Sequence, residues 1–282
     1  MPEVAYVDGS FVPLPEARIS IEDRGFQFAD GVYEVVAVYG GKPYALEPHL
    51  QRLERSLAEL RLSLDVRAHG LESIIMEGIR RSGFADALIY LQITRGTAPR
   101  HHEFPRPAAS PTIVMTVKAL KRLSPETYAR GVAVISRPDQ RWKRCDIKSV
   151  SLLPNILAKE DAVAAGAFEA LLVDDAGRVT EGSSTSSFCV RDGVLWTTPA
   201  GNHILPSITR AVLIQLAADL SIPVRQEYCL LDEYLQAEEV LLAGTTTEAL
   251  AVVQLDGQQI GTGTPGPVTR ALRQAFLETV DG

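Results

Sequence analysis

The sequence predicts an α+β protein of two domains, an N-terminal domain over residues 1–117 and a C-terminal domain over residues 128–282. Runs of β-prone residues alternate with amphipathic helical runs in both halves of the chain. The stretch 118–127 between the halves is polar and turn-prone, as interdomain linkers often are. A chain of 282 residues, 46% of them hydrophobic, is long enough for one large or two modest cores.

The first half is expected to form two hairpins, two helices and two further strands. Residues 4–12 hold two short β-prone runs around an Asp-Gly turn, and residues 32–46 repeat the pattern around Gly-Gly. Leucines at spacings of three and four then predict an amphipathic helix: Leu50, Leu53, Leu57, Leu60 and Leu64. The remaining elements are a helix over residues 71–82 and strands over residues 87–95 and 112–118.

The second half is expected to open with a strand over residues 131–136. A helix over about residues 154–165 follows, entered through Pro154 and closed by Gly166. Ser207, a good N-cap, begins another helix over about residues 207–220. The other expected features are hairpin turns at 174–177 and 191–193, strands over 239–243 and 250–260, and a helix over about 267–280.

Composition excludes several classes of protein. The net charge of −7 is mild and no Lys/Arg-rich run occurs, which argues against nucleic acid or an anionic membrane as the main partner. The N-terminus lacks a basic region followed by an apolar stretch, and no apolar run approaches the ~20 residues that span a bilayer. Three widely spaced cysteines, Cys145, Cys189 and Cys229, suit a reducing cytoplasm better than a disulfide scaffold.

Lys148 is one of only six lysines, and it stands just before an apolar run. Three cationic residues, Arg141, Lys143 and Arg144, precede it within seven positions. Burial and nearby positive charge both disfavour the ammonium form, and such a lysine becomes a nucleophile toward carbonyls. The same local features also fit an ordinary exposed lysine in a basic turn.

Glu181 follows a predicted strand and precedes a run of small hydroxyl residues, Gly-Ser-Ser-Thr-Ser-Ser. Several hydrogen bonds there would keep its carboxylate ionised, as a cofactor's pyridinium nitrogen requires of a partner. A polar hairpin end is the alternative interpretation. No GxSxG motif is present to make one of the serines a nucleophile.

Two segments and one arginine are candidates for binding a phosphate. Residues 205–210 open a helix, whose free N–H groups attract anions, and residues 244–248 offer hydroxyls and amides in a tight loop. Arg52 on the leucine-rich helix would add charge, although a solvated arginine fits the same pattern. None of these signals is specific alone.

Arg100 and His102 lie in a loop marked by Gly and Pro, where an arginine fork and a histidine donor suit a carboxylate. A zinc site at His101 and His102 is disfavoured, because adjacent histidines rarely bind one metal and no matching cluster exists. Residues 261–266 match GxGxxG but follow a hairpin and contain Pro265, so a dinucleotide site is rejected.

Six motifs in order along nearly the whole chain resemble the class IV (fold type IV) pyridoxal-phosphate aminotransferases, and within them the bacterial D-amino acid aminotransferases. The motifs are Glu22-Asp-Arg-Gly-Phe-Gln-Phe-Ala-Asp-Gly-Val-Tyr33-Glu, His49-Leu-Gln-Arg52-Leu, Thr94-Arg-Gly-Thr-Ala-Pro-Arg100-His-His102, Arg144-Cys-Asp-Ile-Lys148-Ser, Val179-Thr-Glu181-Gly-Ser-Ser and Ile208-Thr-Arg. The resemblance implies a smaller N-terminal α+β domain and a larger, α/β-barrel-like C-terminal domain.

The resemblance also implies a cofactor, a reaction and residue roles. Pyridoxal 5'-phosphate would form a Schiff base with Lys148, and the enzyme would transfer an amino group between a D-amino acid and a 2-oxo acid. Glu181 would pair with the pyridine nitrogen, and Leu205 would pack on the ring. The implied phosphate contacts are Arg52, the amides of Ile208 and Thr209, Thr245 and Thr246. Tyr33, Arg100 and His102 would hold the substrate carboxylate, with the loop reaching in from a second subunit of a homodimer.

Two features depart from the family pattern. Gly244 stands where the family often has serine, which makes Thr245 the better phosphate ligand, and His101 is an extra histidine beside His102. The alternatives within the family are branched-chain L-amino acid transamination, (R)-amine transamination and aminodeoxychorismate lyase chemistry. A non-catalytic small-molecule binding protein of the same fold is the alternative of another class.

Overall fold

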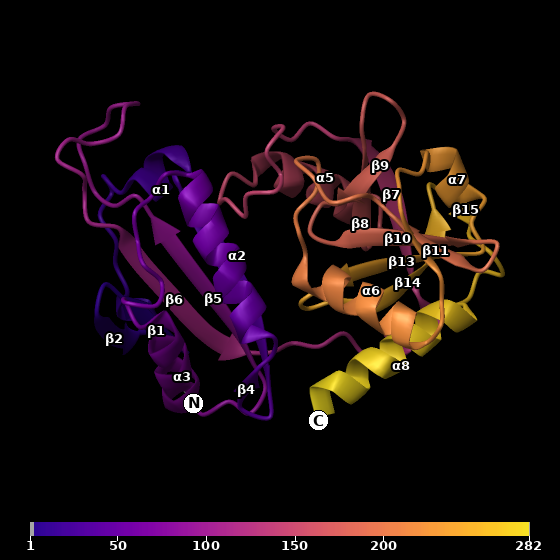
Figure 1. Ribbon diagram of the computed structural model, residues 1–282, viewed down its shortest axis with the longest axis horizontal. Coiled ribbons are helices and arrows are strands. Elements are labelled where there is room, and N and C mark those ends of the chain that lie inside the picture. Colours follow the sequence, from indigo (N-terminus) through magenta and orange to yellow (C-terminus); the bar gives the residue numbers. More distant parts are fainter. Residues whose placement is uncertain (1–2, 282) are drawn as a thin grey trace. The chain divides into compact units, whose positions relative to one another are not determined.

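The computed structural model describes residues 3–281, which fall into two units that interleave along the chain (Figure 1). The first unit holds the residues up to Lys121 together with Ile147–Ser151, and the second holds Arg122–Asp146 and the chain from Leu152 onward. The division after Lys121 falls within the predicted linker 118–127. The short segment that carries Lys148 returns to the first unit, whereas the predicted boundaries place it in the C-terminal domain.

A six-stranded antiparallel sheet forms the first unit, in the order β2-β1-β6-β5-β3-β4. Its strands are β1 (Val4–Val7), β2 (Ser10–Pro13), β3 (Gly31–Tyr39), β4 (Lys42–Pro43), β5 (Ala87–Thr94) and β6 (Thr112–Ala119). The predicted hairpins are confirmed. In the first of them Asp8 and Gly9 both have positive φ, 42° and 99°, a backbone that Gly and Asp tolerate.

Two helices, α2 (Leu46–Glu59) and α3 (Leu71–Ser82), pack their apolar faces on this sheet. The predicted helix through Leu64 is too long, because α2 ends at Glu59 and Arg61 has a φ of 52°. The reason is tertiary. The Arg95 guanidinium donates hydrogen bonds to the carbonyls of Leu60 and Arg61 and so caps the last turn.

A nine-stranded mixed sheet forms the second unit, in the order β12-β11-β10-β13-β14-β7-β8-β9, with β15 added beside β14. The strands are β7 (Val132–Pro138), β8 (Glu169–Val173), β9 (Val179–Gly182), β10 (Ser186–Arg191), β11 (Val194–Thr197), β12 (Val224–Gln226), β13 (Glu239–Gly244), β14 (Glu248–Leu255) and β15 (Gln258–Gln259). Strand β9 also contacts β10, so the sheet curls back on itself as a barrel-like domain requires.

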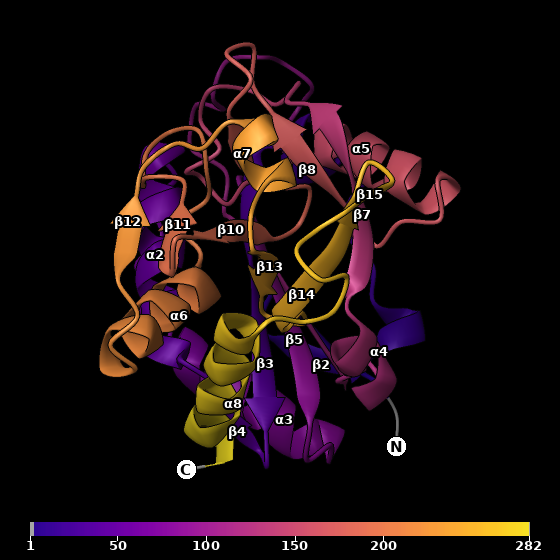
Figure 2. The ribbon, with the colours of Figure 1, turned by 90° about the vertical axis from the view of Figure 1, so that its right-hand side faces the viewer.

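The three helices predicted in the second half of the chain are present and pack on this sheet. Helix α5 (Leu153–Ala164) packs on β7 and β8, while α6 (Ile208–Asp219) and α8 (Pro267–Asp281) pack on each other and on β13 (Figure 2). The strand predicted over 250–260 is broken, because a turn at Asp256 and Gly257, both at positive φ, folds β15 back on β14.

Five short elements were not predicted from the sequence. They are the 3-10 helix η1 (Leu14–Glu16), α1 (Arg24–Phe28), α4 (Pro125–Arg130), α7 (Leu231–Leu235) and β12. Elements of three to six residues are too short to display a hydrophobic period. None of the helices within residues 3–281 combines the length and apolar character that a bilayer crossing needs.

Candidate active site

Lys148 is fixed against the first strand of the first unit's second hairpin, β3. Its carbonyl accepts a hydrogen bond from the Tyr33 amide at 3.0 Å, and its own amide donates to Ser56 Oγ on α2 at 3.3 Å. Ser149 forms a bridge with Val32 in antiparallel sense, so the segment lines the edge of β3. The Nζ atom lies 4.2 Å from the centroid of the Tyr33 ring. The structure therefore brings Lys148 and Tyr33 together.

Two of the three cationic residues that precede Lys148 in the sequence are paired with carboxylates. Arg141 pairs with Asp139 and Glu181, and Arg144 pairs with Asp146, all in the second unit. Both arginine charges are therefore matched by carboxylates. Within the first unit, the Lys148 charge helps to lower the pKa of Glu34.

Arg52 is buried on α2 and is not the solvated arginine that its pattern also allowed. Its Nε and Nη2 donate to the two carboxylate oxygens of Glu34 at 2.8 and 2.7 Å, and His49 Nδ1 lies 2.7 Å from Glu34 Oε2. Burial raises the pKa of Glu34, but the Arg52 and His49 contacts outweigh burial and bring that pKa to about 2. Burial lowers the pKa of His49, against the opposing effect of Glu34. This cluster fixes the Arg52 fork as a buried cation.

Arg100 and His102 lie in the exposed connection between β5 and β6. The Arg100 guanidinium carbon is 4.9 Å from the Phe28 ring centroid, and the His102 ring is 5.7 Å from the same ring at 72°. His102 therefore has a defined aromatic partner, while His101 contributes its carbonyl to Arg24. Tyr33 has its own aromatic neighbour, Tyr90, at 5.6 Å.

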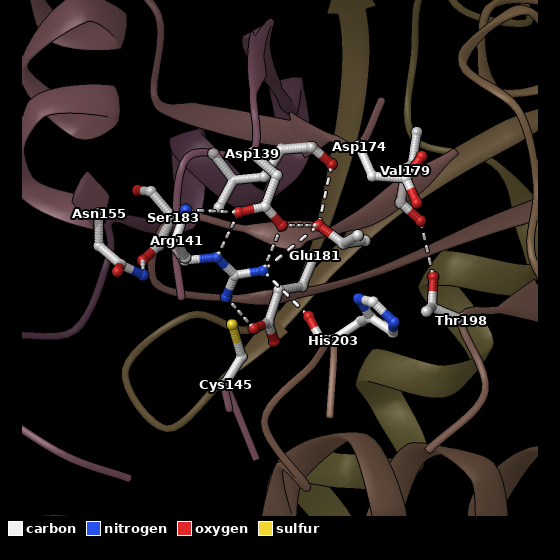
Figure 3. Close-up of polar contacts among 12 residues, drawn as sticks. Asp139, Arg141, Cys145, Asn155, Asp174, Val179, Glu181, Ser183, Thr198 and His203 are labelled. Atoms are coloured by element: carbon white, nitrogen blue, oxygen red, sulfur yellow. Dashed lines mark hydrogen bonds and ion pairs between the residues drawn. The ribbon is translucent and has the colours of Figure 1, made fainter. Parts of the chain in front are cut away.

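Glu181 lies at the end of β9 in a network with Asp139 and Arg141 (Figure 3). Arg141 bridges the two carboxylates, donating to both Asp139 oxygens and to Glu181 Oε1, and it also reaches the His203 carbonyl at 3.1 Å. The Leu205 amide lies 3.2 Å from each Glu181 oxygen. Leu205, predicted to pack on the cofactor ring, is thus tied to Glu181 through its main chain.

The electrostatics of this network are set by two carboxylates sharing one arginine. Burial raises the pKa of Glu181, although Arg141 and the Leu205 amide oppose that effect. Burial also raises the pKa of Asp139, but its hydrogen bonds and charge pairing with Arg141 lower it below the usual value. Arg141 therefore outweighs the effect of burial at Asp139 but not at Glu181. The Glu181 carboxylate would be stabilised by a second positive charge.

The hydroxyl residues after Glu181 do not hold its carboxylate, contrary to the sequence-based expectation. The hydroxyl groups of Ser183, Ser184 and Thr185 donate to Glu169, a fully buried carboxylate on β8. These hydrogen bonds therefore fix the turn between β9 and β10 to β8. Glu181 is held instead by Arg141 and by the Leu205 amide. These partners lie 40 and 24 positions away in the sequence, so no local signal pointed to them.

The first turn of α6 presents main-chain amides as predicted. Ser207 is the N-cap and its hydroxyl accepts from the Arg210 amide, which leaves the Ile208 and Thr209 amides at the helix start without intrahelical acceptors. Thr209 is buried. The Arg210 side chain turns away to Thr197 and Thr198 on and after β11, so it anchors the helix.

Thr245 and Thr246 occupy the turn between β13 and β14, where the Thr247 amide donates to the Gly244 carbonyl. A Cβ added at Gly244 would meet Thr185 and Thr247 at 3.5 Å or more, which is ordinary contact. The position therefore accommodates the serine that the family often has, and the glycine is not required by packing.

The GxGxxG segment has a structural explanation. A Cβ at Gly261 would collide with the Glu238 carbonyl, and one at Gly266 would collide with the Glu239 side chain. The Glu239 carboxylate accepts hydrogen bonds from the amides of Val268 and Thr269, so it caps α8 where a dinucleotide would need its phosphates. The groups of His, Cys, Asp and Glu within residues 3–281 include none that could hold a metal ion.

Comparison with known proteins gives one consistent family. The family model described as "Amino-transferase class IV" matches residues 31–255. The D-alanine aminotransferase of Staphylococcus haemolyticus is 38% identical over 277 residues, which cover 98% of this chain and 97% of that protein. The D-alanine aminotransferase of Staphylococcus aureus (strain MSSA476) is 39% identical over 280 residues, covering 99% of this chain and 98% of that protein.

The fold likeness to solved structures is equally extensive. A T.th. branched-chain amino acid aminotransferase, crystallised with pyridoxamine 5'-phosphate, has a TM-score of 0.91 to this chain at 30% identity. The match covers 99% of this chain and 94% of that chain. The expected two-domain α+β architecture of fold type IV is confirmed.

Proposed function

Because the chain belongs to the class IV aminotransferases, we propose that it transfers the amino group of a D-amino acid, such as D-alanine or D-glutamate, to a 2-oxo acid, such as 2-oxoglutarate or pyruvate. The observation that carries the proposal is the likeness to D-alanine aminotransferases at 38–39% identity over 98–99% of the chain. The chain is thus a transaminase whose substrate class follows from those relatives.

The cofactor is pyridoxal 5'-phosphate, which supplies an aldehyde that condenses with amines and a ring that accepts negative charge. The residues of this chain fit its two charged ends. Glu181 is a buried carboxylate that shares its arginine with Asp139, so a protonated ring nitrogen would supply a further positive charge. The Ile208 and Thr209 amides at the start of α6 suit a phosphate.

The remaining phosphate contacts are assigned to Arg52, Thr245 and Thr246, and the contact with the ring face to Leu205. Arg52 is already a buried cation fixed by Glu34, so it is oriented before any phosphate binds. Thr245 and Thr246 offer hydroxyls from a tight turn whose shape is set by the Thr247–Gly244 hydrogen bond. These assignments share one principle, which is that each donor is held by the fold.

Lys148 is proposed to carry the cofactor and to move the proton of the reaction. Its main chain is held on both sides by Tyr33 and Ser56, so its amine has a fixed origin. With the cofactor and the amino acid bound, the Lys148 amine would take the proton from the substrate Cα and later return a proton. Glu181 would hold the proton on the ring nitrogen and so stabilise the negative charge that develops.

Tyr33, Arg100 and His102 are proposed to hold the substrate carboxylate. An arginine fork and a histidine donor match a carboxylate in charge and in geometry. The place where the carboxylate is held decides which face of the substrate presents its Cα–H to Lys148, and this is the basis of the preference for D-amino acids. Tyr33 already contacts Lys148, which supports a place near the reacting amine.

A homodimer in the cytoplasm completes the proposal. Arg100 and His102 are exposed, as residues that serve a neighbouring subunit would be. Helix α5 also exposes a row of apolar side chains that a second copy would cover: Leu153, Ile156, Leu157 and Val163. The three cysteines are free thiols, in keeping with a reducing compartment.

Branched-chain L-amino acid transamination is the second candidate, because the T.th. branched-chain enzyme shares the fold at a TM-score of 0.91. Its identity of 30% is lower than that of the D-alanine aminotransferases. Initial rates with D- and L-alanine, D- and L-glutamate, and D- and L-leucine decide between the two. Faster turnover of L-leucine than of any D-amino acid would overturn the proposal, and a colourless protein that takes up no cofactor would indicate a binding protein.

A further inference from the structure

The connection from β5 to β6 carries Arg100 and His102, yet it contains no helix or strand of its own. Its first residues are held by the segment that precedes β3. Thr97 pairs with Asp23 in a β-bridge, the Arg24 amide donates to the Gly96 carbonyl at 2.9 Å, and Gly96 has a φ of 89°. A Cβ at Gly96 would collide with the Ser110 carbonyl, so both ends of the connection meet there.

Arg24 extends this support to the residues that flank His102. The side chain is only 4% exposed, and its Nη1 donates to the His101 carbonyl at 2.6 Å. Weaker contacts of 3.4 Å join Nη1 to the Glu103 carbonyl and Nη2 to the His102 carbonyl. One buried guanidinium thus reaches three consecutive carbonyls of an exposed loop.

The other end of the guanidinium is anchored on Asp30, whose Oδ2 accepts from Arg24 Nε at 2.9 Å. Asp30 also has a second cationic partner, because Arg95 donates to both of its oxygens at 2.8 and 3.0 Å. Arg24 differs from Arg95 in that it also donates to the loop carbonyls.

Phe28, the last residue of α1, lies among the side chains of the same loop. Its ring centroid is 4.9 Å from the guanidinium carbons of both Arg24 and Arg100, and 5.7 Å from the His102 ring. Cation–π and edge-to-face contacts of this kind limit the rotamers of both loop side chains.

We infer that Arg24 and Phe28 are positioning residues for the carboxylate-binding pair, with Arg24 fixing the main chain of residues 101–103 and Phe28 fixing the Arg100 and His102 side chains. The inference rests on the proposed function, which assigns Arg100 and His102 to the substrate carboxylate. The inference assigns a positioning role to two further residues of the Glu22–Tyr33 motif, in addition to the proposed substrate contact of Tyr33.

The test compares two substrates that differ only at the carboxylate. D-alanine and D-alaninol, which has a hydroxymethyl group in its place, are reacted with holoenzyme in single turnovers followed by cofactor absorbance. Arg24→Lys is expected to raise the apparent dissociation constant for D-alanine about tenfold, the equivalent of one charge-assisted hydrogen bond. Phe28→Leu is expected to raise it about threefold. The maximal rate and the reaction with D-alaninol should change less than about twofold, the difference that separates positioning from general damage.

Two matched variants serve as controls. Arg18→Lys alters an exposed arginine that also donates to main-chain carbonyls, those of Pro15 and Ala17. Phe26→Leu alters a phenylalanine on the same helix that is 70% exposed. Both should react with D-alanine as the wild type does, with the same oligomeric state by gel filtration.

Equal losses on both substrates, or no loss on either, would overturn the inference. If Arg24→Lys does not fold, Phe28→Leu decides by the same criterion. Arg100→Ala separates this inference from the proposed function. If Arg100→Ala weakens D-alanine selectively and the other two variants do not, only the inference fails. If Arg100→Ala shows no selectivity, the carboxylate assignment fails and the inference with it. In the double variant Arg24→Lys/Arg100→Ala, the effects should be less than additive.

Discussion

Replacing Glu34 by glutamine is expected to destabilise the protein by about 3 kcal/mol at pH 7. The Glu34 side chain is 1% exposed and accepts two hydrogen bonds from Arg52. Burial raises its pKa, but the Arg52 and His49 contacts bring that pKa from the usual 4.5 to about 2. The two pKa values differ by about 2.5. Because a difference of one in pKa corresponds to about 1.36 kcal/mol, Glu34 contributes about 3 kcal/mol of stability.

The same numbers fix how this stabilisation depends on pH. Because the pKa of Glu34 is lower in the folded chain, its contribution is complete well above 4.5 and is lost as the pH falls toward 2. Between pH 7 and pH 3.5 the wild type should lose about 1 kcal/mol through this group. The glutamine variant has no charge to lose, so its deficit should shrink by that amount.

Urea unfolding followed by circular dichroism at several pH values measures both quantities. The control is Glu47→Gln on α2, the helix that carries Arg52, where the carboxylate is exposed and paired with the exposed Arg67. This control should change stability little. The reasoning is refuted if Glu34→Gln matches the wild type at pH 7, or if its deficit stays constant down to pH 3.5.

Three further predictions concern the reaction. Lys148→Ala should abolish transamination, and near-wild-type turnover of that variant would remove Lys148 from its role. Glu181→Gln should lower kcat about a hundredfold or more, because a neutral amide does not hold the proton on the ring nitrogen; a kcat within about threefold of the wild type would contradict this role. Dimers refolded from a mixture of Lys148→Ala and Arg100→Ala chains should gain activity with D-alanine over either variant alone. A mixture no more active than Arg100→Ala would show that the loop serves its own subunit.

The sequence was sufficient for the elements whose signal is local and repeated. The leucine period of α2, the Asp-Gly turn of the first hairpin and the Ser207 cap of α6 each lie within one short window, and each feature is present. The end of α2 was beyond this reasoning, because the residue that caps it, Arg95, lies 34 and 35 positions from the carbonyls that it reaches. Leu60 and Leu64, the last leucines of the pattern, still pack against the core although α2 ends before them.

The candidate site divides in the same way. The sequence by itself was enough to propose which groups bear the chemistry, since Lys148, Glu181, Arg52 and the Arg100/His102 loop stand in motifs that resemble those of the family. Only the tertiary structure decided their partners. Arg141 pairs with both Glu181 and Asp139, and hydroxyl groups of the run after Glu181 donate to Glu169. Spacing along a chain fixes the order of side chains, whereas charge pairing and burial depend on distances that exist only after strands far apart in sequence have paired.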